Sequence, residues 1–185
     1  IKIGKKADLA VFSDLIKFRP VMTLIGGMDV TGMRVPRFKF PSWSRKTVKV
    51  NPASRLDITF KTPERFKKRP TVPVNVIVLG HGLLTKKEVV HLKNSNGVIK
   101  SDSKKDVLKA FVMERLSGRG KPVVGFVRGF GLKSGAFGGS TGQDCQHVVV
   151  VGCRDADIAA VIDMIRKRQG GIFFAMNGRV VSGVN

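Results

Sequence analysis

Residues 125–152 read GFVRGFGLKSGAFGGSTGQDCQHVVVVG, a glycine-rich run that leads into a polar cluster and then a row of valines. Glycine at this density is typical of segments that turn with positive φ or approach another backbone or a ligand closely. The valines and the glycine after them predict a buried strand over residues 147–152. The stretch therefore predicts tight loops whose polar side chains meet at the mouth of a buried strand.

The sequence after this strand predicts a helix and a hairpin. Residues 155–168 carry acidic side chains in the first turn, basic side chains in the last turn and an apolar face at helical spacing. The pair Gly170-Gly171 ends this helix. Residues 172–176 and 179–184 then form a hairpin around Asn177-Gly178, which is a strong signal for a type I′ turn.

The sequence before residue 125 predicts further strands. Residues 107–115 fit helical spacing of apolar side chains, whereas their β-branched and aromatic content favours a strand, so pattern alone leaves both open. The expected fold class is α+β or α/β, with a mixed sheet and one clear helix. The other strands predicted here are residues 74–79, 89–92, 98–99 and 123–127.

Residues 1–30 read as an extended meander. Strands are predicted over residues 7–12 and 21–25, and the chain returns at residues 28–30 after a tight Gly26-Gly27 turn. Because the chain begins at Ile1 rather than Met and stops just after an apolar run, we expect it to be a piece of a longer protein.

Charge is distributed unevenly. The 185 residues include 34 Lys and Arg against 13 Asp and Glu, a net charge of +21. Residues 34–69 alone hold 12 basic and two acidic residues, interleaved with aromatic rings and prolines. Such a field attracts polyanions, and single-strand binders use interleaved rings for stacking. No RNA-reader motif accompanies the stretch, so a nucleic-acid interface and a solvated connection over residues 31–73 both stay open.

Several functional classes lack their motifs. Cys145 and Cys153 match neither a disulfide framework nor zinc-ligand spacing, and we expect both to be thiols in a reducing cytoplasm. His81, His91 and His147 form no H-x-H or H-E-x-x-H arrangement, and no Walker loop or G-x-S-x-G elbow is present. No apolar stretch approaches the roughly 20 residues of a membrane span, and no signal-peptide pattern is found.

The polar cluster after the glycines is the densest candidate site. Gln143, Asp144, Gln146 and His147 stand together just before the valine strand. They form either a small polar site at the strand mouth or a set of loop side chains that satisfy backbone groups. The residues alone leave both readings open.

Two segments carry a family resemblance. Residues 3–12, IGKKADLAVF, resemble the segment that amidohydrolases carry just after their catalytic barrel, where the chain re-enters a small β-sandwich. Residues 124–136 are similar to the glycine-rich signature of the adenine deaminase C-terminal domain, and the similarity continues to Asn177-Gly178. In that family the segment matching residues 106–115 is a strand, which we adopt. The resemblance implies a β-sandwich segment over residues 1–30, a variable connection over residues 31–73 and the C-terminal domain over residues 74–185.

The resemblance implies hydrolytic deamination of adenine to hypoxanthine and ammonia in purine metabolism. In such enzymes a divalent metal, manganese or iron, activates water in the barrel. The barrel ligands have no counterpart in this chain, so we expect it to bind no metal and to be inactive alone. The expected partners are the barrel and further copies of the parent protein, with no membrane. Two alternatives remain, a basic nucleic-acid-binding module and a subunit-association module.

One departure from the family concerns the polar cluster. Where the family reads His-Asp-Ser-His-Asn, this chain reads Gln143-Asp144-Cys145-Gln146-His147. The acid is kept, but glutamine replaces both matching histidines and cannot shuttle protons near neutral pH. No residue of this chain is assigned a catalytic role. The loop expected to face the active site comprises Gln143, Asp144, Gln146 and His147, together with Gly129, Gly131 and Lys133.

Overall fold

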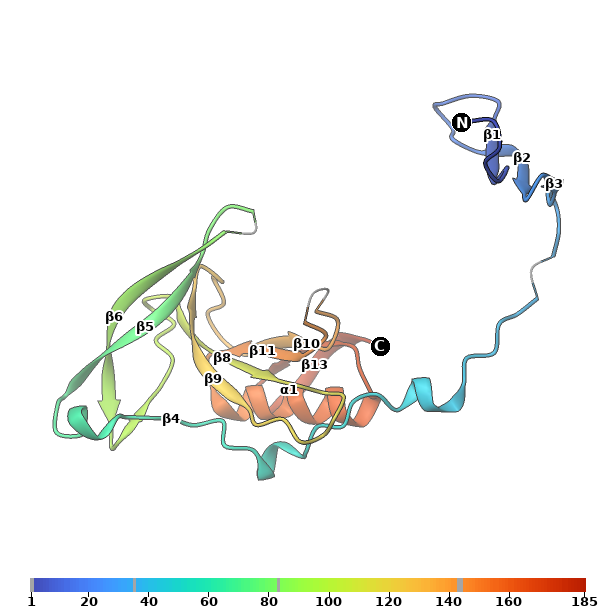
Figure 1. Ribbon diagram of the computed structural model, residues 1–185. Helices are drawn as coiled ribbons and strands as arrows, with labels where there is room; N and C mark the ends of the chain where they lie inside the picture. Colours follow the sequence, from blue (N-terminus) through green and yellow to red (C-terminus); the bar gives the residue numbers. More distant parts are fainter. Residues whose placement is uncertain (1, 35, 83, 143–144) are drawn as a thin grey trace. The chain divides into compact units, whose positions relative to one another are not determined.

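The computed structural model describes residues 2–34, 36–82, 84–142 and 145–185. It divides into two compact units, Ile1–Phe40 and Pro41–Asn185. The first unit is a small sheet, and the second contains a large sheet and the helix (Figure 1). The sequence-based boundaries at residues 30 and 73 stay predictions, while residues 41–73 share the second unit with the C-terminal elements.

In the first unit, the described residues form a three-stranded antiparallel sheet in the order β1 (Leu9–Phe12), β2 (Pro20–Ile25) and β3 (Met28–Asp29). Gly26 and Gly27, both with positive φ, make the turn between β2 and β3, so the predicted hairpin is confirmed. None of the described side chains in this unit is buried. Large apolar side chains are instead exposed on it, including Val11, Val21, Met22, Ile25 and Met28.

The described residues of the second unit form ten strands. They are β4 (Phe60–Lys61), β5 (Thr71–Leu79), β6 (Thr85–Ser95), β7 (Val98–Ile99), β8 (Val107–Met113), β9 (Val123–Arg128), β10 (Ala136–Gly139), β11 (Val148–Gly152), β12 (Ile172–Met176) and β13 (Arg179–Val184). They form one sheet in the order β13-β12-β10-β11-β8-β9-β5-β6-β7-β4. Neighbours are antiparallel except β5 and β9, which pair in parallel at Ile77–Val127 and Val78–Arg128. The expectation of a mixed sheet is confirmed.

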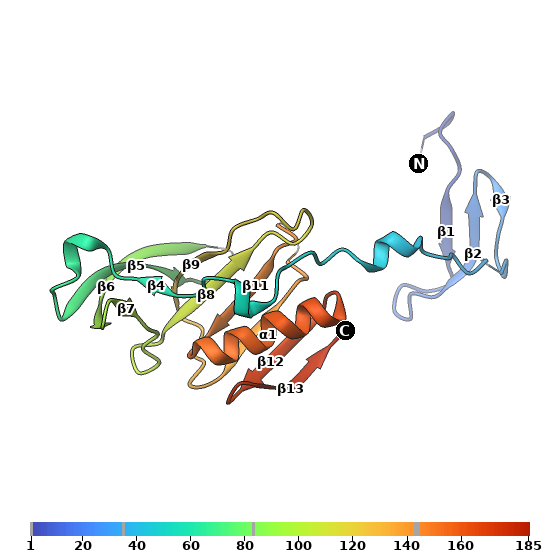
Figure 2. The ribbon, with the colours of Figure 1, turned by 90° about the horizontal axis from the view of Figure 1, so that it is seen from below.

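The larger core lies between the helix α1 (Asp155–Arg168) and one face of β8 and β10–β13. Figure 2 shows α1 lying along these strands. The apolar helix face predicted from spacing is buried, and Ile158 and Ile162 are fully so. The predicted helix limits are confirmed, and Gln169 ends the helix in the left-handed conformation just before Gly170.

A smaller core lies under the hairpin of β5 and β6. Val72, Val74 and Val76 of β5 alternate inward and meet Leu92 of β6 and Phe126 of β9. These two strands are longer than predicted. Lysines in β6 and Pro73 in β5 interrupted the apolar pattern, but those side chains occupy outward or half-buried positions of a regular ladder.

Residues 41–69, the part of the basic, proline-rich segment that belongs to the second unit, run along the other elements of that unit. Their only regular elements among the described residues are short 3-10 helices and β4, as the prolines predicted. η1 (Ser42–Arg45), η2 (Ala53–Arg55) and η3 (Glu64–Phe66) each begin directly after a proline. Val48, Val50 and Ala53 are buried in the larger core.

The ambiguous segment before Glu114 is a strand, β8, as the family resemblance implied. The C-terminal hairpin of β12 and β13 around Asn177 and Gly178 is also confirmed. No strand was predicted at β10, which has the sequence AFGG. Gly138 is required there because a Cβ would lie 2.5 Å from the Val149 carbonyl oxygen, so close strand packing selects glycine over a better strand former.

In the part of the chain that the structure describes, no helix is long and apolar enough to cross a membrane.

Candidate functional site

The glycine-rich loop after β9 is held by one carboxylate. Asp106 Oδ2 accepts the Gly129 N–H and Asp106 Oδ1 accepts the Gly131 N–H, each at 2.9 Å. Gly129, Gly131 and Asp106 all have positive φ. Both carboxylate oxygens are thus used to fix a turn that glycine alone adopts at low cost. Lys133, further along the loop, is exposed.

Arg128, at the start of this loop, is held by contacts with Glu88 and Lys105. Its Nη1 lies 2.6 Å from Glu88 Oε1 of β6, and its Nε donates to the Lys105 carbonyl oxygen at 3.1 Å. Since both side chains of the ion pair are partly exposed, we assign the pair a positioning role rather than a large stabilising one.

The polar cluster before β11 is held by a second arginine. Arg115 Nε donates to the Gln146 carbonyl oxygen at 2.7 Å, and Arg115 Nη2 donates to Gln146 Oε1 at 3.2 Å. Gln146 itself has positive φ, and its N–H closes the turn onto the Gly142 carbonyl oxygen at 2.9 Å. Gln143 and Asp144 of the predicted site lie outside the described residues.

His147 is half-buried near Glu114. Hydrogen bonds from the Ser117 hydroxyl and N–H hold the pKa of Glu114 below its ordinary value, and the charge of His147 adds a smaller effect. The Leu116 N–H also donates to this carboxylate. Glu114 therefore stays ionised beside His147 and closes the turn that follows β8.

The two halves of the predicted site lie at opposite ends of β8. Arg128, just before Gly129, pairs with Val107, whereas Val148, just after His147, pairs with Met113. Six residues of extended strand separate these positions, about 20 Å. The structure thus brings Gln146 and His147 together, and Gly129 and Gly131 together, but keeps the two pairs apart.

An apolar groove connects the two ends. It has a volume of about 260 Å³ and lies on the sheet face opposite α1. Phe130 from the first loop packs near Phe137, with ring centroids 6.4 Å apart, while Thr141 and Gly142 come from the second loop. The remaining lining residues are Gly138, Gly139, Val149, Val151 and Ile172.

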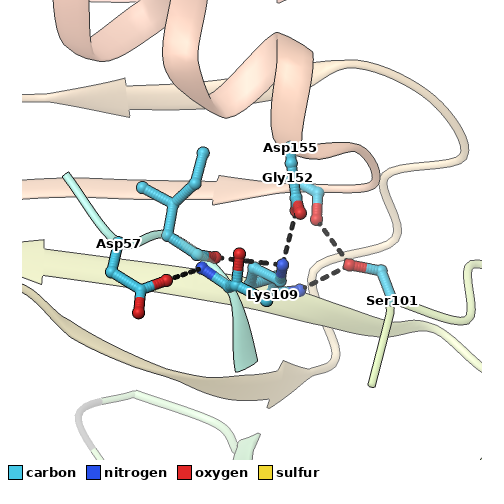
Figure 3. Close-up of polar contacts among 7 residues, drawn as sticks. Asp57, Ser101, Lys109, Gly152 and Asp155 are labelled. Atoms are coloured by element: carbon cyan, nitrogen blue, oxygen red, sulfur yellow. Dashed lines mark hydrogen bonds and ion pairs between the residues drawn. The ribbon is translucent and has the colours of Figure 1, made fainter. Parts of the chain in front are cut away.

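A buried lysine sits where β8 passes from one core to the other. Lys109 is 1% exposed, and its Nζ donates to Asp155 Oδ1 at 2.5 Å and to the Ile58 carbonyl oxygen at 3.1 Å. Ser101 Oγ accepts the Lys109 N–H at 2.8 Å and donates to the Gly152 carbonyl oxygen at 2.9 Å. Figure 3 shows this network linking β8, α1 and the segment beside Asp57. It is a polar network that connects elements of the fold rather than a ligand site.

No group of three or more His, Cys, Asp and Glu side chains that could hold a metal ion is found among the described residues. Cys145 is an exposed free thiol. Burial, with smaller effects from Asp157 and Asp106, raises the pKa of the Cys153 thiol, so that this group stays protonated near neutral pH.

The sequence did not indicate the structural roles of Asp106 and Arg115 or the ion pair between Lys109 and Asp155. A lysine inside an otherwise apolar strand is the one signal that could have indicated a buried ion pair. Asp106 and Arg115 form hydrogen bonds with backbone groups that are distant in sequence. Only the register of β8 against its neighbours brings these partners together.

Comparison with known proteins identifies the family. Residues 82–185 match the model of the adenine deaminase C-terminal domain. The adenine deaminase of Methanococcoides burtonii is 32% identical over 182 residues, which covers 98% of this chain and 30% of the relative. Adenine deaminase 1 of Carboxydothermus hydrogenoformans is 31% identical, covering 96% of this chain and 30% of the relative. That of Dehalococcoides mccartyi strain CBDB1 is 33% identical over 150 residues, covering 81% of this chain and 25% of the relative. The chain spans a quarter to three tenths of the length of these relatives, and it belongs to the adenine deaminase family, of which it carries the C-terminal domain.

Proposed function

We propose that this chain is the C-terminal part of a metal-dependent adenine deaminase, which converts adenine and water to hypoxanthine and ammonia in the cytoplasm. The observation that carries the proposal is the alignment of nearly the whole chain to less than a third of each relative. A divalent metal, manganese or iron, held in the barrel of the parent protein would supply the activated water. The described residues of this chain include no group that fits such a metal, so no reaction step is assigned to them.

The first unit supports the need for a larger parent. Three strands cannot bury both faces of their sheet, and exposed apolar side chains such as Val21 and Ile25 have no cover within the unit. We propose that the missing part of the β-sandwich and the barrel cover them, and that the parent protein assembles as a homo-oligomer.

The loop before β11 is the part of this chain proposed to border the substrate. Gln143 and Asp144, with Gln146 and His147, offer hydrogen-bond donors and acceptors suited to the edge of a purine. Arg115 holds the Gln146 backbone, which supports a preorganised loop. Gly129, Gly131 and Lys133 belong to the loop whose Phe130 lines the other end of the apolar groove, and we propose that they contact the parent protein rather than adenine.

The isolated chain is expected to release no ammonia from adenine, because the proposed metal ligands belong to the barrel. The measurement is ammonia release by the purified 185-residue chain, with added manganese or iron, beside the full-length protein. Activity of the full-length protein alone supports the proposal. Robust turnover by the isolated chain would show that the metal site had been assigned to the wrong part of the protein.

Asp144→Ala in the full-length protein is expected to lower kcat/KM for adenine at least tenfold, since a charge-assisted hydrogen bond to the substrate would be lost. Cys145→Ala, in the same loop, is the matched control and should leave kcat/KM within a factor of two. If both variants and the unchanged protein have the same kcat/KM, the proposal that this loop contacts the substrate is wrong.

A further inference from the structure

The basic segment of the second unit has a feature that deamination does not use. We define the cationic strap as residues 45–69, which hold nine basic and two acidic residues. Asp57 pairs with Lys61 at 3.0 Å, and Glu64 pairs with Lys67, so the two acidic residues of the strap engage two of its nine basic residues. All nine basic residues are exposed: Arg45, Lys46, Lys49, Arg55, Lys61, Arg65, Lys67, Lys68 and Arg69.

The backbone at the start of the strap is fixed to α1 and β8. The Val48 N–H donates to Gln169 Oε1 at 3.2 Å, and Gln169 Nε2 donates to the Val48 carbonyl oxygen at 3.1 Å. The Lys49 N–H donates to the Arg115 carbonyl oxygen at 2.7 Å. The Ala53 N–H donates to Asp163 Oδ1 of α1 at 2.9 Å.

The rest of the strap is fixed to the sheet. The Ile58 carbonyl oxygen accepts a hydrogen bond from buried Lys109, and β4 pairs with β7. The Thr62 N–H donates to the Gly97 carbonyl oxygen at 2.8 Å. Asn94 Nδ2 donates to the carbonyl oxygens of Lys67 and Arg69 at 2.9 and 3.0 Å. The strap is therefore held along its length by hydrogen bonds to its backbone, and its basic side chains stay exposed.

The strap has a linear form. Figures 1 and 2 show it running beside α1 and then to β4 at the far end of the sheet. Val48, Val50, Ala53 and Thr62 point inward and are buried, while the basic side chains between them are exposed. A row of fixed cations on an extended segment matches a linear polyanion better than a small anion, which needs donors that converge on one point.

Apolar and aromatic surface accompanies the charges. A cleft of about 400 Å³ is lined by Arg55, Lys61 and Lys121 together with Phe60. Trp43, just before the strap, is 74% exposed. Sites for single-stranded nucleic acid combine a positive track for phosphates with rings on which bases stack.

We propose that the cationic strap binds the sugar–phosphate backbone of single-stranded nucleic acid, with bases placed against the cleft beside Phe60 and against Trp43. This site is independent of the deaminase reaction, because it uses none of the residues proposed to border adenine. Among the described side chains of the strap, seven basic residues form no ion pair with its two acids.

The test measures binding of a fluorescently labelled 20-nucleotide poly(U) to the 185-residue chain by anisotropy at several salt concentrations. If about five phosphates are neutralised, the logarithm of the binding constant should fall with the logarithm of salt at a slope of about −3.5. Absence of binding near 0.1 M salt, or a slope near zero, would overturn the proposal.

Two variants with the same net charge separate the strap from the general charge of the protein. The strap variant carries Lys46→Gln, Lys49→Gln, Arg55→Gln and Lys68→Gln. The control carries four exposed substitutions elsewhere: Lys86→Gln, Lys104→Gln, Lys167→Gln and Arg179→Gln. The strap variant should bind at least tenfold more weakly at about 0.1 M salt, with a slope flatter by about 3, and the control should stay within threefold. An equal loss of poly(U) affinity in the two variants would mean that binding depends only on the net charge of the protein, and it would overturn the proposal.

A second readout needs no variant and therefore does not depend on how a variant folds. Bound poly(U) should protect Lys49 and Lys68 of the unmodified chain from acetylation while Lys86 and Lys104 stay reactive. Equal protection of all four lysines would contradict binding at the strap. Displacement of poly(U) by polyglutamate at equal charge concentration would identify an acidic protein segment as the partner instead and would also overturn the proposal.

Discussion

Asp155→Ala is expected to lower the free energy of unfolding of the second unit by about 3 kcal/mol, because it leaves the ammonium of Lys109 buried with a single carbonyl acceptor. Lys109→Met should cost less, about 1–2 kcal/mol, since Asp155 is 42% exposed and can return to water while methionine fills the apolar space. The order of these two effects is the distinctive part of the prediction.

The double variant Lys109→Met with Asp155→Ala completes a thermodynamic cycle. In the methionine background Asp155→Ala should cost only about 0.3–1 kcal/mol, which is the loss of a favourable charge in the first turn of α1. Urea unfolding followed by circular dichroism measures all four proteins. Additive losses would mean that the two side chains do not interact in solution.

Gly135→Ala is expected to cost about 3 kcal/mol. Gly135 has a φ of +81°, and a Cβ there would lie 2.5 Å from the Ala175 carbonyl oxygen and 2.8 Å from the Phe174 ring. A left-handed non-glycine residue costs roughly 1–2 kcal/mol, and forced displacement of packed neighbours costs about 1–3 kcal/mol more.

Gly131→Ala is the matched control for the cost of positive φ. Gly131 has a φ of +73°, but nothing lies within 4 Å of its ideal Cβ position. It should therefore lose only about 1–2 kcal/mol. Thermal or urea unfolding of both variants compares the two positions directly. Equal losses would contradict the close approach of β12 to Gly135.

The elements that the sequence could predict are those whose signals are local. The helix at Asp155–Arg168 combines charge placement with an apolar face, and the turn at Asn177-Gly178 depends on its own two residues. Both signals lie within a few residues of the elements that they specify. The segment at Val107–Met113 is different, because its apolar spacing fits a helix while its β-branched and aromatic content favours a strand, and the family resemblance decided for the strand.

The features that the sequence could not predict depend on strand order. β10 contains two glycines and has weak intrinsic preference for a strand, yet it lies between β11 and β12. Asp106 becomes the clamp of the glycine-rich loop only because β8 and β9 pair in the observed register. The same register puts His147 and Gly129 at opposite ends of β8, although the two residues are close in sequence.

The division of the second unit into two cores has a consequence for cooperativity. The hairpin of β5 and β6 joins the rest of the sheet through a parallel ladder at Ile77 and Val78, and its core is separate from that under α1. β8 and β9 contribute to both cores, and between the cores β8 carries a charged side chain, Lys109. At this point the two regions are connected by the polar contacts of Lys109 rather than by apolar packing. We therefore expect the hairpin to open locally while α1 and its strands stay folded, so that the second unit behaves as two foldons joined through β8 and β9.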